Sequence, residues 1–169
     1  LAHPQTHFLD SLRQLEEVAP TLSYPCILKP IFTHLWRLRY GATKALVIES
    51  APALIDAYRA LDGAGEKVMV QEIVPGADDR IWVYMTYIDR QGRPLAWFSG
   101  HKVRQYPIHF GIGSFLISQR SDELIALARG FFDRIGYVGL AGIEFKLDPR
   151  DNRLKFFEVN VRTIMTNEI

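Results

Sequence analysis

The fold of this chain is decided by two runs that face each other across a turn, Gly142-Ile143-Glu144-Phe145-Lys146-Leu147 and Leu154-Lys155-Phe156-Phe157-Glu158-Val159-Asn160-Val161-Arg162. The segment between them, Asp148-Pro149-Arg150-Asp151-Asn152-Arg153, is rich in turn-forming residues, which predicts an antiparallel hairpin. Side chains alternate between the two faces of a strand, so one face of this hairpin is apolar and is expected to pack on a core. That face carries Ile143, Phe145, Leu147, Phe157, Val159 and Val161.

The opposite face of the predicted hairpin is polar. It carries Glu144, Lys146, Glu158, Asn160 and Arg162. A hairpin that is symmetric about Asp151 places Glu144 directly opposite Glu158, since each lies seven residues from Asp151. Like charges that are directly opposite destabilise a sheet, so we expect a cation between these two carboxylates.

The residue types on the polar face favour magnesium as that cation. Two carboxylates and the amide oxygen of Asn160 are hard oxygen ligands, which suit Mg²⁺. Magnesium held in this way usually keeps substrate phosphates among its other ligands, so ATP chemistry is the leading hypothesis. An alternative remains open, because charged residues are common on the solvent face of an antiparallel pair and a slip of register would exchange the two faces.

The composition of the chain is that of an ordinary globular protein. Its 169 residues suffice for one domain or two small lobes, with 48% hydrophobic and 23% charged residues. A net charge of +1 gives no electrostatic reason to expect nucleic acid or an anionic membrane as a partner. No apolar stretch reaches the length of a membrane span.

Cysteine usage and the ends of the chain add two expectations. The single cysteine, Cys26, excludes an internal disulfide and fits a reducing, cytoplasmic location. It lies in an apolar run, where we expect it to be a buried small hydrophobe. The chain starts at Leu1 without methionine and stops soon after the hairpin, so we expect a fragment of a longer protein.

The rest of the sequence predicts two α+β halves. In the first half we expect a helix over 9–18, strands over 24–30, 45–48 and 67–74, and a helix that Ser50 begins. In the second half we expect strands over 81–88, 95–103 and 112–117, and then a helix that Ser121 begins and Gly136 ends. The turn over 75–79 is the expected boundary between two α+β layers.

Four segments, in this order, resemble the ATP-grasp superfamily of the carboxylate–amine ligase type, related to the ATP-binding domains of biotin carboxylase and carbamoyl-phosphate synthase. They are Tyr24-Pro25-Cys26-Ile27-Leu28-Lys29-Pro30, Gln71-Glu72-Ile73-Val74-Pro75-Gly76, Lys102-Val103-Arg104, and Glu144 with Glu158-Val159-Asn160-Val161-Arg162. The likeness covers nearly the whole chain. It implies a two-lobed α+β fold with antiparallel or mixed sheets, helices on one face of each and the nucleotide between the lobes. The small lobe would be 1–75, with its hinge strand at 67–74, and the large lobe 76–169.

The first two segments are those that the resemblance assigns to the nucleotide. Lys29 would meet phosphate oxygens as a point charge. The backbone of Glu72 and Val74 would bind the adenine edge, and Gln71 would face the adenine amino group, where most relatives have an acidic residue. Asp78 would bind the ribose hydroxyls, with Asp79 as an equal candidate. In relatives the loop after the first strand is a glycine-rich flap. The corresponding loop here has only one glycine, and its nucleotide contacts would come from Arg37, Arg39 and Lys44.

The last two segments are those that the resemblance assigns to the chemistry. Glu144, Glu158 and Asn160 would hold one or two Mg²⁺ ions, for which Mn²⁺ can substitute. Lys102 and Arg104, alternating onto one face of their strand, would neutralise charge on the transferring phosphoryl group. Arg162 would orient the acceptor carboxylate through its planar guanidinium.

The activity implied by the resemblance is that of a ligase. ATP would phosphorylate a small-molecule carboxylate to an acylphosphate, and an amine or a related nucleophile would then attack it to form a carbon–nitrogen bond. A homodimer is compatible with such an enzyme, and the fragment by itself is expected to bind nucleotide weakly or to be inactive. Two alternatives stay open: a nucleotide-binding module without catalysis, and an interaction domain whose charged hairpin face is simply solvated.

Overall fold

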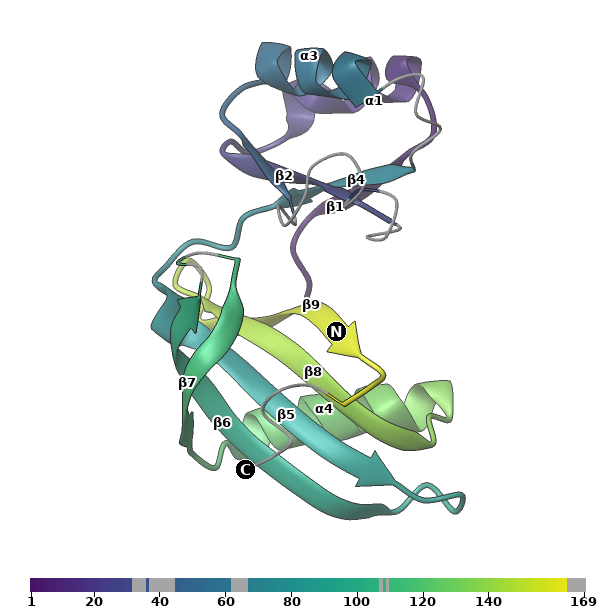
Figure 1. Cartoon of the computed structure of the whole chain (residues 1–169), viewed down its shortest axis with the longest axis vertical. Coiled ribbons are helices and arrows are strands. Elements are labelled where there is room, and N and C mark those ends of the chain that lie inside the picture. The colour runs from purple at the N-terminus through teal and green to yellow at the C-terminus, as the bar shows by residue number, and fades with distance from the viewer. Residues whose placement is uncertain (32–35, 37–44, 62–66, 107, 109, 164–169) are drawn as a thin grey trace. The chain divides into compact units, whose positions relative to one another are not determined.

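The structure is a computed structural model that describes residues 1–31, 36, 45–61, 67–106, 108 and 110–163 (Figure 1). The chain divides into two compact units. We call Pro4–Ile73 the N-terminal unit, and Leu1–His3 together with Val74–Ile169 the C-terminal unit. The first residues join the C-terminal unit through a hydrogen bond of 2.8 Å from the Phe156 N–H to the Ala2 carbonyl. Both units are α+β, and every strand pair in them is antiparallel.

The N-terminal unit contains a four-stranded sheet in the order β1-β4-β2-β3. Its elements are β1 (Thr6–Leu9), α1 (Leu12–Val18), the short 3-10 helix η1 (Ala19–Thr21), β2 (Cys26–Pro30), β3 (Leu46–Ile48), α3 (Ala51–Leu61) and β4 (Val68–Glu72). The sequence prediction missed β1 and began the first helix too early. Leu9 ends β1, where it pairs with Val68, and the helix begins after Ser11, whose hydroxyl accepts the N–H of Gln14 at 3.3 Å.

The helices α1 and α3 cover the same face of the N-terminal sheet, as Figure 1 shows. The core between them includes Leu9, Leu15, Cys26, Leu28, Trp36, Leu54, Val68 and Val70. Trp36 is fully buried there. Cys26 is also fully buried, and burial raises the pKa of its thiol to about 11, so it is a packing residue as the sequence predicted.

The C-terminal unit contains a five-stranded sheet in the order β7-β6-β5-β8-β9. Its elements are the 3-10 helix η2 (Asp78–Arg80), β5 (Ile81–Ile88), β6 (Pro94–Tyr106), β7 (Ile112–Ser118), α4 (Asp122–Ile135), β8 (Gly139–Asp148) and β9 (Arg153–Asn160). The sequence predicted each of these strands and the helix, although β6 is longer than expected. No helix among the described residues is long and apolar enough to cross a membrane.

The helix α4 covers one face of the C-terminal sheet (Figure 1). Ser121 caps its first turn by accepting the N–H of Leu124 at 3.3 Å, and Gly136 ends it in the left-handed conformation at φ 63°. The apolar face of α4 packs on Tyr84, Ile143, Phe145 and Leu154 of the sheet. The other face of β8 and β9 is therefore the one that can present polar groups.

The hairpin of β8 and β9 has the predicted register near its open end and a different one near its turn. Glu144 pairs with Glu158, as predicted, but the next pair is Phe145 with Phe156, because the register shifts by one residue there. This bulge corrects one prediction, since Phe156 packs against Phe145 in the core in place of Phe157. A second correction concerns Val161, which lies beyond the end of β9 and is 63% exposed.

Candidate functional site

The uncovered face of the C-terminal sheet brings the three predicted metal ligands together. Glu144 on β8 pairs directly with Glu158 on β9, and Gly142 pairs with Asn160. Residues that pair directly across antiparallel strands point to the same face. Ile143 and Phe145, which flank Glu144, pack toward α4, so the three polar side chains lie on the face that α4 leaves uncovered. The predicted register of these residues is confirmed, whereas the metal itself remains a prediction.

Lys102 supplies a positive charge beside these carboxylates. Its ammonium lies 2.5 Å from Oε2 of Glu144, and the side chains are only 8% and 9% exposed. Lys102 pairs with Ile81 across β6 and β5, so its side chain reaches Glu144 over the central strand of the sheet. The repulsion expected between Glu144 and Glu158 is thus reduced by a lysine that the resemblance had assigned to phosphate.

The donor chemistry of this face fits a divalent ion such as Mg²⁺. Asn160 donates its Nδ2–H to Oε1 of Glu158 at 3.0 Å, which leaves the amide oxygen as a further hard donor. In the described part of the chain no three His, Cys, Asp or Glu side chains group around a common point. Glu144, Glu158 and Asn160 stay the predicted protein ligands of a metal, and such a small set leaves positions for phosphate and water.

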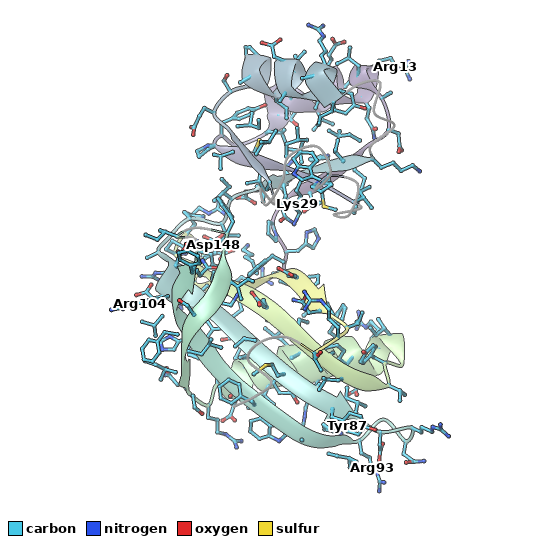
Figure 2. The ribbon with its side chains drawn as sticks, viewed as in Figure 1. Arg13, Lys29, Tyr87, Arg93, Arg104 and Asp148 are labelled. Carbon is cyan, nitrogen blue, oxygen red and sulfur yellow. The ribbon has the colours of Figure 1, made fainter. Side chains whose placement is uncertain are left out.

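The two arginines predicted to assist catalysis are both exposed. The pairing register of β6 with β7 shifts between Lys102 and Arg104, and Lys102 is buried while Arg104 is exposed. The simple alternation assumed for these two residues therefore does not hold. Arg104, labelled in Figure 2, lies on β6 and pairs with Phe115 of the edge strand β7. Arg162 follows the end of β9 and donates to the carbonyl of Thr163 at 3.1 Å.

Lys146 is a cation on the same face to which sequence reasoning gave no role. Its ammonium donates to the carbonyl of Gly76 at 2.7 Å, and it pairs with Lys155 across the hairpin. Burial lowers the pKa of Lys146, and the negative charge of Asp78 acts in the opposite direction. Asp78, predicted to bind ribose, lies in η2 and is partly buried, while its neighbour Asp79 is exposed.

In the N-terminal unit, the predicted phosphate lysine and the predicted adenine residue are in direct contact. Lys29 donates from Nζ to Oε1 of Gln71 at 2.9 Å, and Nε2 of Gln71 donates to the hydroxyl of Thr6 at 2.9 Å. The Thr6 hydroxyl in turn donates to the carbonyl of Pro4 at 3.0 Å. Figure 2 shows Lys29 on the sheet face that the helices leave uncovered.

This chain of hydrogen bonds fixes the orientation of the Gln71 amide. A lysine ammonium only donates, so it requires the amide oxygen of Gln71. The Thr6 hydroxyl gives its proton to Pro4, so it can only accept from the amide nitrogen. Both ends of the amide are thus set by chemistry, and the two contacts agree. Sequence reasoning missed Thr6, although Thr6 and Phe8 are residue types that are favoured in strands.

The remaining nucleotide candidates are less well placed or lie outside the described residues. The strand β4 ends at Glu72, two residues before the predicted end of the hinge strand. The Glu72 N–H donates to the carbonyl of Gln5 at 2.9 Å, so a base would have to use other backbone groups of this segment. Val74 is buried at 6% exposure. Lys44, with Arg37 and Arg39 of the same loop, lies outside the described residues.

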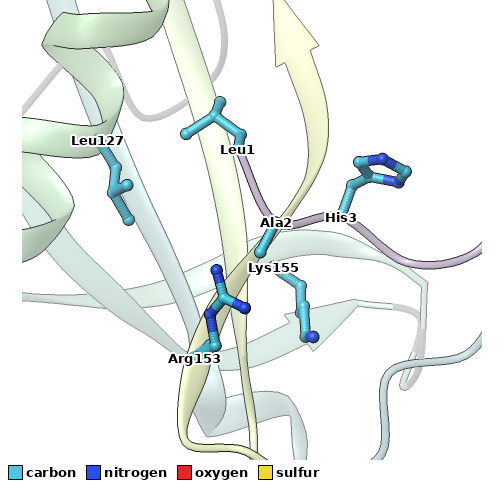
Figure 3. Close-up of a pocket in the computed structure, with 6 residues that line it drawn as sticks. All are labelled: Leu1, Ala2, His3, Leu127, Arg153 and Lys155. Carbon is cyan, nitrogen blue, oxygen red and sulfur yellow. The ribbon is translucent and has the colours of Figure 1, made fainter.

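A separate pocket lies on the C-terminal unit, away from the predicted ligands (Figure 3). Its volume is about 650 Å³, and it is lined by Leu1, Ala2, His3, Leu127, Arg153 and Lys155. Lys155 donates to the Asp151 carboxylate at 2.6 Å and lies 3.9 Å from Asp148. None of the residues predicted for ATP or metal lines this pocket.

Comparison with known proteins identifies one informative relative. The chain is 28% identical over 154 residues to the D-aspartate ligase of Enterococcus faecium (strain Aus0004). The match covers 88% of this chain and 36% of the ligase, so the chain spans about a third of the length of that relative. No protein-family model matches the chain.

Solved structures resemble the chain over almost its whole length. An ADP complex of N5-carboxyaminoimidazole ribonucleotide synthetase gives a TM-score of 0.71 at 20% identity, covering 98% of this chain and 42% of that one. The L-amino acid ligase of Bacillus licheniformis gives 0.68 at 20% identity, covering 99% and 38%. The biotin carboxylase domain of the Hydrogenobacter thermophilus 2-oxoglutarate carboxylase, solved with MgADP and bicarbonate, gives 0.69 at 14% identity, covering 100% and 38%. At these identities the likeness establishes the fold.

Proposed function

From the premise that this chain has the ATP-grasp fold and is homologous to a D-aspartate ligase, we propose that it is the ATP-binding part of a carboxylate–amine ligase. The observation that carries the proposal is the pairing of Glu144 with Glu158 beside Asn160, on a sheet face where Lys102 already compensates one carboxylate. This combination of hard oxygen donors and a buried lysine suits a metal–phosphate group. A solvated hairpin face would not require a lysine that is 6% exposed.

The residues of the C-terminal unit would act on the phosphates. Glu144, Glu158 and Asn160 would hold Mg²⁺, which supplies charge neutralisation at the phosphates when bound. Lys102 would donate to a phosphate oxygen and stabilise the charge that develops during phosphoryl transfer. Arg162, on an exposed bend, would pair with the acceptor carboxylate, and Asp78 would accept from the ribose hydroxyls.

The residues of the N-terminal unit would act on the nucleotide. Lys29 would donate to a phosphate oxygen, held in place by Gln71 and Thr6. The backbone of Glu72 at the end of β4, apart from its N–H, and of Val74 at the start of the C-terminal unit would bind the adenine edge. No protein nucleophile is required, because ATP would activate a carboxylate as an acylphosphate, releasing ADP. An amine would then attack the carbonyl carbon and release phosphate.

We further propose that an amino acid is one of the two substrates. The support comes from the relatives, since the D-aspartate ligase and the L-amino acid ligase both act on amino acids. The test is a coupled ADP-release assay in which the protein is given Mg·ATP and pairs of D- and L-amino acids. Amino-acid-dependent ADP release that Glu158→Ala abolishes is the expected result.

One alternative has support of its own. Gln71 stands where most ATP-grasp ligases have an acidic residue, so a nucleotide-binding module without catalysis is the second candidate. The two are separated by measuring binding and turnover on the same sample. Stabilisation by Mg·ADP in a thermal shift without any amino-acid-dependent turnover favours the module. If saturating Mg·ADP gave no stabilisation, both candidates would fail, and an interaction domain would become the better explanation.

A further inference from the structure

The ion pair of Lys102 and Glu144 has a consequence for the order in which ligands enter the site. We propose that Lys102 is an internal counter-ion of Glu144 that a metal ion has to displace, so that the site resists metal alone and accepts metal together with phosphate. The inference rests on the proposed function, because it takes Glu144 to be a metal ligand. It adds a role for Lys102 before any nucleotide is bound.

Separating Lys102 from Glu144 costs free energy for both side chains, because both are buried. The ammonium and the carboxylate are 2.5 Å apart, and both side chains are more than nine-tenths buried. A buried charge that loses its partner is strongly unfavourable, because water cannot replace the lost interaction. Glu158, the other carboxylate on this face, is exposed and accepts a hydrogen bond from Asn160. A metal ion that binds Glu144 must therefore break a buried ion pair, whereas a metal ion that binds Glu158 meets an exposed carboxylate.

The strand β7 leaves space for the side chain of Lys102. A Cβ atom at Gly113 would lie 3.2 Å from Cε and 3.3 Å from Cδ of Lys102, and 3.1 Å from Cδ1 of Leu116. Each of these distances is closer than an ordinary van der Waals contact. The aliphatic part of the Lys102 side chain thus lies against Gly113, and any larger residue at position 113 would displace Cδ and Cε of Lys102. Gly113 is accordingly a positioning residue for the ammonium of Lys102.

Phosphate changes the balance between the two partners. If metal alone took Glu144, Lys102 would be left buried without a counter-charge. If the metal arrives with phosphate, Lys102 can donate to a phosphate oxygen, and one ion pair is exchanged for two favourable interactions. By reciprocity, whatever phosphate adds to metal affinity, metal adds to phosphate affinity.

The first test measures the affinity for Mn²⁺ in the absence of nucleotide. Free Mn²⁺ is counted by electron paramagnetic resonance during titration of the wild type, Lys102→Met and Glu144→Gln. Lys102→Met removes the ammonium that a metal ion would have to displace from Glu144, so we expect it to bind Mn²⁺ at least about tenfold more tightly than the wild type. Glu144→Gln should bind Mn²⁺ more weakly. Unchanged Mn²⁺ affinity in a folded Lys102→Met protein would overturn the proposal.

A second variant keeps the proposal testable if Lys102→Met does not fold. Gly113→Val retains the lysine but displaces its stem, and valine is favoured in a strand. We expect tighter Mn²⁺ binding in the same direction, by a smaller factor. Gly130→Ala is the matched control, because a Cβ at this exposed position in α4 meets nothing within 4 Å. Equal Mn²⁺ affinities for Gly113→Val, Gly130→Ala and the wild type would count against the inference.

A thermal-shift experiment gives an independent readout. In EDTA, Lys102→Met should melt below the wild type, because its buried Glu144 has lost the ion pair with Lys102. Saturating Mn²⁺ should raise the melting temperature of this variant more than that of the wild type. A smaller or equal rise would contradict the displacement of Lys102.

The outcomes also separate this inference from the proposed function. If Glu144→Gln and Glu158→Gln both weaken Mn²⁺ binding while Lys102→Met leaves it unchanged, the metal site stands and the counter-ion role of Lys102 is wrong. If neither glutamate variant affects Mn²⁺ binding, or if no variant binds Mn²⁺ at millimolar concentrations, the metal site and this inference are both wrong.

Discussion

Replacing Glu144 and Glu158 one at a time should separate a carboxylate that stabilises the fold from one that does not. Glu144→Gln removes the charge that faces Lys102, whose side chain is 8% exposed. Removing one partner of a buried ion pair costs about 3–5 kcal/mol. The amide oxygen of the new glutamine can still accept from the ammonium, so we expect a loss near the lower end, about 3 kcal/mol.

Glu158→Gln should have a much smaller effect on stability. Glu158 is exposed, and it accepts a hydrogen bond from Asn160 at 3.0 Å, which a glutamine oxygen can also accept. An exposed polar contact of this kind contributes roughly 0–1 kcal/mol. The two variants should therefore differ by about 2 kcal/mol in the free energy of unfolding, although both should lose metal affinity.

The assay is urea unfolding in EDTA, with Asp133→Asn on the exposed side of α4 as a control for a simple loss of charge. Trp82 and Trp97 lie on neighbouring strands of the same sheet as Glu144, so their fluorescence reports the unfolding of this unit, and Trp36→Phe in all variants removes the signal of the N-terminal unit. If Glu144→Gln and Glu158→Gln lost the same stability to within about 0.5 kcal/mol, the Lys102–Glu144 pair would not have the energetic weight that its burial implies.

Two further predictions test other polar contacts. Thr6→Val removes the acceptor of the buried Gln71 amide nitrogen and so loosens Lys29, and we expect a threefold to tenfold loss of ATP affinity by isothermal titration, on the order of 1 kcal/mol. Thr6→Ser should restore most of this affinity, whereas equal affinities for Thr6→Val and the wild type would show that this contact does not position the lysine. Hydrogen bonds from Arg150 lower the pKa of Asp148 from 3.8 to about 2, so the ionised carboxylate stabilises the fold above the unfolded pKa, and this stabilisation is lost as the pH falls from about 4 toward 2. In urea unfolding, Arg150→Ala should therefore lose no more than about 2 kcal/mol of stability at pH 7 and less at pH 3, and a loss that does not depend on pH would contradict this explanation.

Local sequence rules were sufficient for most elements of the C-terminal unit. Ser121 and Gly136 sit at the two ends of α4 because a hydroxyl can cap the first turn and glycine tolerates the left-handed conformation that ends it. The pairing of Glu144 with Glu158 followed from counting residues about the turn. These features depend on neighbours in the chain, which is why they could be predicted.

The bulge between Glu144 and Phe145 could not be predicted in the same way. The symmetric hairpin assigned Phe157 to the core, but it is the ring of Phe156 that packs against the rings of Phe131 and Phe145. Neighbouring residues of a strand point to opposite faces, and because both residues here are phenylalanines, the sequence does not show which of them faces the core. Only the packing of α4 on the sheet distinguishes them. The strand β1 was missed for a related reason, because its pairing with β4 is made with residues about 60 positions away.

The sequence alone determined where α4 begins and ends, that Ile143 and Phe145 face the core, and that two glutamates meet across a hairpin, since all of these depend on local backbone geometry. Tertiary structure decided the partners: Lys102 reaches Glu144 across β5, and Thr6 reaches Gln71 from a strand far away in the sequence. A lysine side chain is long enough to contact any of several neighbours. Only the order of the strands in the sheet and the burial of each charge select one of these neighbours as its partner.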